Sequence, residues 1–223
     1  MVDFSSLYTL PSVDFYFLRH GKSEGNIQGL VQGRLNYPLS TLGKEQAEAT
    51  GKWFVGKPIL KVFTTPLDRG KETARIISEV ASLPAPEELP SLIELDTGVF
   101  TGITLEEAKI QYPEMYQQFL RDSWEGVRGA ERIWQLKERA ILVWKTLIDG
   151  VKEVKNVKGN SIGVLAVSHA GLLQWIVKIT LGSNSWFPLL PMGDCGIYHL
   201  SLQGTVTRWA LLNFQAPGVS GHR

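Results

Sequence analysis

The chain contains three short apolar runs. Each is followed by polar residues and then by a segment whose apolar residues recur with the period of a helix. The runs are Val13–Leu18, Leu60–Thr64 and Ile162–Val167. Each is short and rich in aromatic or β-branched residues, which predicts a buried strand. A helix should follow the second run, with Thr65 as its N-cap and Pro66 at its first position. Another should follow the third, over Leu172–Leu181.

Two further helices and a late hairpin complete the pattern. Apolar positions near a 3.6-residue period predict a helix after Gly43, burying Ala49 and Trp53 with Phe54 as a further candidate, and a longer one from about Ala130 to Val151. Gln203-Gly204 between two strand-like segments predicts a hairpin at a sheet edge. Strands alternating with helices indicate an α/β domain with a largely parallel sheet and helices on both faces.

Two stretches lack a regular period. One is the Pro-rich segment 83–90, which predicts a loop. The other, at about 100–129, has short helical pieces and several aromatic residues, and we interpret it as a lid-like insertion. Residues 1–223 then form a single domain. The tryptophans Trp53, Trp134, Trp144 and Trp209 are expected to fill the core and the lid, whereas the places of Trp124 and Trp186 stay open.

Composition narrows the class of protein. The 223 residues carry a formal net charge of +1 with acids and bases interspersed, so no basic stripe suggests a nucleic-acid partner. No apolar stretch approaches the length of a membrane span, and no secretory signal is visible. The single cysteine, Cys195, excludes an internal disulfide. We therefore expect a cytoplasmic protein with no membrane association.

The strand ends carry the chemistry. In open α/β sheets ligands bind at the carboxyl ends of strands, where Arg19, His20, Arg69 and His169 are predicted to lie. Guanidinium groups bind phosphate oxygens through charge-assisted hydrogen bonds, and imidazole can act as a covalent nucleophile. Neighbouring cations would keep His20 unprotonated for in-line attack. The pattern predicts phosphoryl transfer through a phosphohistidine, without a metal or other cofactor.

A leaving alkoxide needs a proton, which a nearby carboxylic acid usually supplies. Glu94 precedes Gly98 and Gly102, two glycines that let the backbone approach a ligand closely. Asp96 on the same segment is the alternative proton donor.

These segments together resemble the histidine phosphatase superfamily, the phosphoglycerate mutase-like proteins. The resemblance is ordered and spans about residues 13 to 213. It rests on Arg19-His20-Gly21-Lys22-Ser23 with Asn26, on Gln32 to Ser40, on Thr65-Pro66-Leu67-Asp68-Arg69, on Glu94 with Gly98 and Gly102, and on Val167-Ser168-His169-Ala170-Gly171.

The resemblance implies a three-layer α/β/α sandwich around a mostly parallel sheet with an antiparallel edge. It implies catalytic roles for His20, Arg19, Arg69, His169 and, as proton donor, Glu94, and substrate contacts from Ser23, Asn26, Gln32, Gly33 and the Ala170 backbone. The segment Gly129-Ala130-Glu131 matches a family element only with an extra alanine, so Glu131 receives no site role. The tail matches loosely, so His222 receives none either.

The function predicted on this basis is metal-independent hydrolysis of a small phosphomonoester. One alternative is a cofactor-dependent phosphoglycerate mutase, which would need a basic segment after the acid motif. That region offers only Lys109, Arg121 and Arg128 among aromatic residues. A non-catalytic phosphate- or partner-binding module on the same fold is the alternative of another class. The sequence fixes neither the substrate nor the oligomeric state.

Overall fold

The structure is a computed structural model that describes residues 2–10, 12–153 and 161–219. One six-stranded sheet runs through the molecule. Its strand order is β3-β2-β4-β1-β5-β6. The bounds are β1 Val13–Arg19, β2 Ile59–Thr64, β3 Glu87–Glu88, β4 Ile162–Ser168, β5 Ile197–Gln203 and β6 Val206–Phe214. The strands β1 to β4 run parallel, while β5 is antiparallel to β1 and pairs with β6 in the predicted hairpin.

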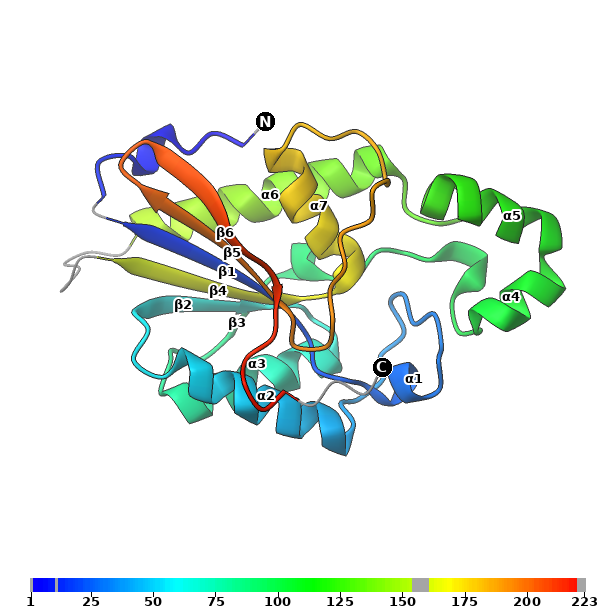
Figure 1. Cartoon of the computed structure of the whole chain (residues 1–223), viewed down its shortest axis with the longest axis horizontal. Helices are drawn as coiled ribbons and strands as arrows, with labels where there is room; N and C mark the ends of the chain where they lie inside the picture. The colour runs from blue at the N-terminus through cyan, green and yellow to red at the C-terminus, as the bar shows by residue number, and fades with distance from the viewer. Residues whose placement is uncertain (1, 11, 154–160, 220–223) are drawn as a thin grey trace.

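Helices cover both faces of this sheet (Figure 1). On one face lie α2 (Thr41–Phe54) and α3 (Asp68–Ala81), packed against a cluster that includes Tyr16 and Leu18 of β1. On the other lie α6 (Ile133–Lys152) and α7 (Ala170–Thr180), packed against Phe15 and Phe17 of the same strand. Alternate side chains of β1 thus face two cores, as a strand buried on both sides requires. The predicted three-layer α/β/α fold is confirmed.

Two helix details differ from the predictions. The helix after β2 begins at Asp68, with Leu67 as its N-cap, rather than at Pro66 after a Thr65 cap. In α2, Ser40 caps the first turn through its side chain. The fully buried face carries Ala47 in place of Ala49, together with the candidate Phe54, and Trp53 is partly buried. The period was therefore right but the buried face is rotated, because the helix packs against both α3 and β1.

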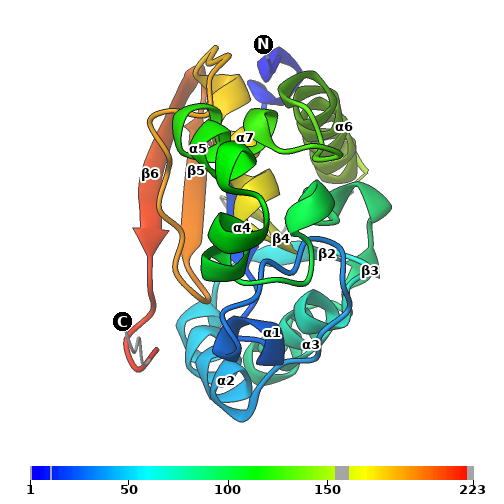
Figure 2. The same cartoon turned by 90° about the vertical axis from the view of Figure 1, so that its right-hand side faces the viewer.

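The segment predicted as a lid extends beyond the carboxyl ends of the parallel strands (Figures 1 and 2). It contains α4 (Leu105–Gln111), α5 (Pro113–Asp122) and a short 3-10 helix (Ser123–Gly126). Its aromatic residues form a small cluster of their own around Phe100, which Trp124 joins to the main core. The Pro-rich loop holds one element that the sequence did not reveal, the two-residue strand β3 at the sheet edge.

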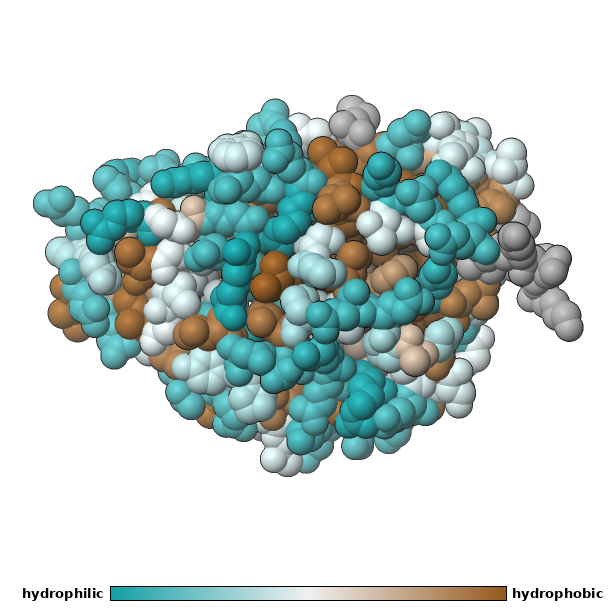
Figure 3. Space-filling view, turned by 180° about the vertical axis from the view of Figure 1, so that it is seen from behind, coloured by the Kyte–Doolittle hydropathy of each residue, from teal (hydrophilic) through white to brown (hydrophobic). Residues whose placement is uncertain are grey.

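The remaining helical elements are short. Further short helices are α1 (Glu24–Ile27) and the 3-10 segments Ser5–Leu7, Pro90–Leu92 and Gly98–Phe100. Seen from behind, polar side chains predominate and hydrophobic ones appear among them in small groups (Figure 3). Across the described residues, no helix combines the length and hydrophobicity needed to cross a bilayer.

The two tryptophans of α6 have opposite environments. Trp144 is 1% exposed and meets the rings of Phe4, Phe15 and Phe17 edge-on, with centroids 5.0–5.2 Å apart. Its indole N–H donates to the carbonyl of Ile176 on α7. Trp134, which we expected in the core or lid, is 61% exposed because the first turn of α6 extends past the sheet.

Replacing Trp144 by alanine should therefore lower the free energy of unfolding by about 3–5 kcal/mol, through lost burial and a residual cavity. The matched change Trp134→Ala on the same helix should alter it by less than about 0.5 kcal/mol. Urea titration followed by circular dichroism measures both values. Equal losses in the two variants would contradict this description of the core.

Candidate active site

The carboxyl ends of β1, β2 and β4 bring the predicted histidines together. The backbone N–H of His20 donates to the carbonyl of Ser168 at 3.0 Å, and that of Thr65 donates to Val167 at 3.1 Å. These bonds extend the parallel ladders by one residue beyond each strand. The rings of His20 and His169 consequently lie with centroids 5.0 Å apart. Residues distant in sequence thus meet at one edge of the sheet, as predicted.

His20 is held neutral and in one orientation. The side chain is buried, at 3% exposure, and its Nδ1 lies 2.6 Å from the carbonyl oxygen of Gly21. A carbonyl oxygen only accepts, so Nδ1 carries the proton and Nε2 carries the lone pair. Burial, and then the charges of Arg19 and Arg69, hold the pKa of His20 well below 6.5. The ring therefore presents an unprotonated Nε2 at neutral pH.

Arg69 is the cation in direct contact with that nitrogen. Its Nε–H donates to His20 Nε2 at 3.3 Å, and its two terminal nitrogens donate to the carbonyls of Leu35 and Gly33 at 2.6 and 2.9 Å. Gly33 has a φ of 49°, and a Cβ there would collide with the hydroxyl of Thr97. Burial lowers the pKa of Arg69 to about 10, so the guanidinium remains charged at neutral pH.

Arg19 is held by the loop that precedes β5. Its guanidinium donates to the carbonyl of Met192 at 2.8 Å and pairs with the carboxylate of Asp194 at 3.3 Å. Its Nε is buried and has no hydrogen-bond partner among the described residues. Arg19 thus offers an unsatisfied donor next to His20.

His169 is fully buried behind the first histidine. Its Nε2 lies 2.8 Å from the hydroxyl of Thr65, and its Nδ1 has no partner within the described chain. Burial, followed by the proximity of His20, Arg69 and Arg19, holds the pKa of His169 well below 6.5. Thr65, predicted as a helix cap, instead orients this ring.

Glu94 sits at the N-terminus of α7. Its carboxylate accepts from the backbone N–H groups of Leu95, Leu172 and Gly171, at 2.8, 3.1 and 3.3 Å. Positive partial charge at a helix N-terminus suits this carboxylate. The alternative proton donor, Asp96, instead accepts from the N–H of Gly98 and pairs with Arg34.

One cavity of about 240 Å³ joins most of the predicted site residues. Glu94 lines it and Asp96 does not, which favours Glu94 as the proton donor. Also lining it are the predicted residues Arg19, His20, Asn26, Gln32, Gly33, Arg69 and Ala170, and the unpredicted residues Leu30, Val31, Leu95, Thr97, Trp124, Gly171 and Gln174.

Two predicted residues support the wall without lining the cavity. His169 lies behind His20, and Ser23 is completely buried. Ser23 caps the short helix α1 and donates its hydroxyl to Gln32 Oε1 at 2.9 Å. The Ser23 side chain therefore orients a wall residue. This is a local capping box, so the Ser-x-x-Asn spacing has a structural reason beside its resemblance to the family motif.

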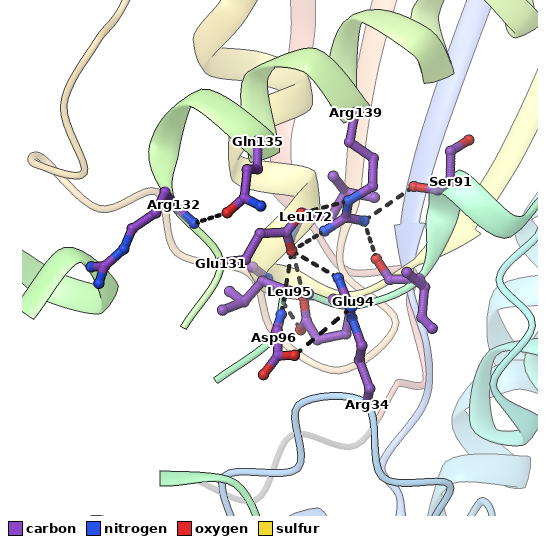
Figure 4. Close-up of polar contacts among 12 residues, drawn as sticks. Arg34, Ser91, Glu94, Leu95, Asp96, Glu131, Arg132, Gln135, Arg139 and Leu172 are labelled. Carbon is purple, nitrogen blue, oxygen red and sulfur yellow. Dashed lines mark hydrogen bonds and ion pairs between the residues drawn. The ribbon is translucent and has the colours of Figure 1, made fainter. Parts of the chain in front are cut away.

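A buried ion pair that the sequence did not reveal lies beside the Glu94 segment (Figure 4). Glu131 is 8% exposed, and its carboxylate accepts from both Nε and a terminal nitrogen of Arg139, at 2.9 and 2.6 Å.

Among the residues described, no group of three or more His, Cys, Asp or Glu side chains is placed to hold a metal ion. His222 lies outside the described residues.

Proteins similar in sequence to this chain include phosphatases and a mutase. A metal-independent phosphoserine phosphatase of Arabidopsis thaliana is 30% identical over 77% of this chain and 71% of its own length. A 2,3-bisphosphoglycerate-dependent phosphoglycerate mutase of Chelativorans is 31% identical over 87% of this chain and 96% of its own. The match to a wheat 2-carboxy-D-arabinitol-1-phosphatase, in contrast, spans 35% of that protein.

The fold and the family agree. A structure described as mycobacterial hydrolase 1 superposes with a TM-score of 0.81 at 23% identity, over 92% of this chain and 100% of that one, which shows the same fold. Residues 15–215 match the histidine phosphatase superfamily, branch 1. The chain therefore belongs to the histidine phosphatase superfamily, branch 1, and is an enzyme of the histidine phosphatase type.

Proposed function

We propose that this enzyme hydrolyses a small phosphomonoester through a covalent phosphohistidine at His20. One observation carries the proposal. The carbonyl of Gly21 fixes the proton on Nδ1 of a buried, neutral imidazole, and the free Nε2 lies against a guanidinium at the cavity wall. A nucleophile, an anion-binding charge and a space for substrate thus coincide.

In the first step the phosphoryl group replaces Arg69 as the partner of His20 Nε2. The Nε2 lone pair attacks phosphorus, and the bond from phosphorus to the alcohol oxygen breaks. Arg19 and Arg69 oppose the charge on the phosphoryl oxygens, as electrostatic catalysis of phosphoryl transfer requires. Glu94, on the same cavity, gives its proton to the departing oxygen.

In the second step a water molecule enters the space left by the alcohol. Glu94 takes its proton, the oxygen attacks phosphorus, and the bond from phosphorus to nitrogen breaks. The electron pair returns to Nε2 and inorganic phosphate departs. Glu94 thus acts as acid and then as base from one position.

The relatives include both phosphatases and mutases, and the lid favours hydrolysis. A mutase must retain a doubly phosphorylated intermediate, for which extra cations around the cavity are needed. Lys109, Arg121 and Arg128 are the basic residues of the lid, and all three are exposed and outside the cavity lining. Phosphoryl transfer to water therefore fits this site better than transfer to a retained acceptor.

Replacing His20 by alanine should reduce the hydrolysis of p-nitrophenyl phosphate in EDTA by at least about 1000-fold, because the covalent route is lost. Acid-labile phosphate should also be absent from protein that is quenched with base after mixing with substrate. Nitrophenolate absorbance measures the first effect and phosphopeptide mass spectrometry the second.

His199→Gln is the matched control, because His199 pairs with Asp14 and stacks on Tyr16, outside the cavity lining. That variant should keep the wild-type rate and the phosphohistidine. A wild-type rate in His20→Ala would identify another nucleophile and end the proposal.

The two neutral histidines also make stability depend on pH. Because folding lowers the pKa of His169 below 6.5, the unfolded chain binds more protons than the native state in the interval below 6.5. The free energy of unfolding should therefore decrease as the pH falls from 7 to 5. In the variant His169→Gln, the free energy of unfolding should decrease by up to about 1.4 kcal/mol less per pH unit than it does in the wild type. Urea unfolding at several pH values measures the slopes, and parallel slopes would contradict a neutral buried ring.

A further inference from the structure

Apart from His20, Arg19, Arg69 and Glu94, the cavity wall is made of uncharged side chains. Leu30, Val31 and Trp124 give it an apolar side, contributed by the loop after α1 and by the lid. Its other polar residues are neutral, namely Asn26, Gln32, Thr97 and Gln174. The Oε1 atoms of Gln32 and Gln174 accept from Ser23 and from the N–H of Leu190, which leaves their amide N–H₂ groups as the donors available to a ligand.

Positive charge is confined to the end of the cavity that holds the phosphoryl group. Arg19 and Arg69 are the cations among the described residues that line it, and both adjoin His20. The nearby Arg34 is turned away, toward Glu131 and Asp96. A carboxylate on the leaving alcohol would lose water and meet no second cation, and it would share the cavity with Glu94. Burying an uncompensated charge in this way is costly.

We propose that the alcohol released by this site bears no anionic group of its own, and that its apolar part packs against Leu30, Val31 and Trp124. Hydroxyl groups on that alcohol find amide donors in Gln32 and Gln174. The volume of about 240 Å³ suits a small alcohol beside the phosphoryl group. This inference rests on the proposed phosphatase activity. It separates the chain from relatives named for phosphoserine and phosphoglycerate, whose substrates carry a carboxylate.

A pair of substrates differing in one remote charge tests this. Benzyl phosphate and 4-carboxybenzyl phosphate release alcohols of similar acidity, so their kcat/KM ratio reports on the wall rather than on the chemical step. The wild type should prefer benzyl phosphate by more than about tenfold, and Leu30→Arg should bring the ratio close to one. Ile110→Arg is the matched control, because it adds the same charge to the lid at a site 79% exposed and outside the cavity.

The outcomes are separable. A wild-type preference that persists in Ile110→Arg and vanishes in Leu30→Arg supports the inference. Equal or better hydrolysis of the carboxylated substrate by the wild type overturns it while leaving the phosphatase proposal intact. No turnover of either ester or of p-nitrophenyl phosphate overturns the proposed activity itself, and the inference with it.

An independent observation concerns the segment that carries Glu94. The guanidinium of Arg139, held by Glu131, donates to the carbonyls of Ser91 and Ile93 (Figure 4). The Nε of Arg34 donates to the carbonyl of Glu94 at 3.2 Å, and a terminal nitrogen of the same guanidinium donates to the Glu131 carboxylate at 3.2 Å. The Glu131 carboxylate also accepts from the N–H of Asp96 at 3.3 Å. Backbone groups on both sides of Glu94 are therefore fixed by one buried carboxylate and its two arginines.

The geometry assigns Glu131 as a positioning residue for the proton donor. It does not line the cavity, so it acts on the reaction only through the Glu94 segment. Loss of its charge would leave Arg139 without its bidentate partner and would loosen the carbonyls of Ser91 and Ile93. The carboxylate of Glu94 would then lie less accurately against the leaving oxygen, and small misplacements of this kind have large effects on rate.

Leaving-group dependence distinguishes this role from a structural one. Nitrophenolate leaves without a proton, whereas the benzyl alkoxide needs one. The ratio of kcat/KM for p-nitrophenyl phosphate to that for benzyl phosphate should rise more than about tenfold in Glu94→Gln and in Glu131→Gln. The ratio does not depend on the folded fraction of a preparation. Arg139→Lys gives a second variant that retains the charge but not the bidentate contact.

Glu79→Gln is the control, since Glu79 forms an exposed ion pair with Arg75 on α3. Its ratio should equal that of the wild type. An unchanged ratio in Glu131→Gln and Arg139→Lys, beside a raised ratio in Glu94→Gln, would overturn the positioning role alone. An unchanged ratio in Glu94→Gln would overturn the proton-donor role on which it rests.

Discussion

The burial of an imidazole beside two guanidinium groups is the constraint on which the rest of the site depends. His20 is almost completely buried, so its charged form is disfavoured, and the charges of Arg19 and Arg69 disfavour it further. The same arginines are themselves buried or half-buried beside a neutral ring. A phosphoryl dianion supplies what the cluster lacks, because it pairs with both cations and accepts the Nε2 lone pair at phosphorus. In the proposed mechanism, substrate binding and activation of the nucleophile are therefore one electrostatic event.

The fold supplies the geometry for this event through backbone groups. The carbonyls of Gly21, Gly33 and Leu35 orient His20 and Arg69. Two N–H groups in the first turn of α7, and that of the neighbouring Leu95, orient Glu94. Parallel strands placed side by side bring these groups together, because their carboxyl ends meet at one edge of the sheet. The loop after α1, with Leu30 and Val31, and Trp124 of the 100–129 segment add uncharged side chains to the cavity at this edge. In the proposed mechanism the sheet determines the chemistry, and the remaining cavity walls determine which alcohol fits.

The sequence predicted those parts of the structure that local patterns determine. Arg19 ends a strand, His20 and His169 each follow one, and Arg69 lies in the first turn of a helix. Strand-end geometry is local, so the meeting of these residues could be predicted. Thr65 was misread as a cap because its partner, His169, is 104 residues away. Glu131 received no role because its segment matches the family element only with an extra alanine, and its contacts with Arg34 and Arg139 form only in the folded chain. The two-residue strand β3 and the neutral cavity wall likewise depend on long-range packing, which periodicity does not report.

The state of His20 is the central claim, and nitrogen-15 NMR of histidine-labelled protein tests it most directly. At pH 6 the account predicts a protonated Nδ1 and an unprotonated Nε2 for His20, with no titration near 6.5 and with signals assigned by their loss in a His20 variant. A ring that titrates with a pKa near 6.5, or that carries its proton on Nε2, would contradict the account.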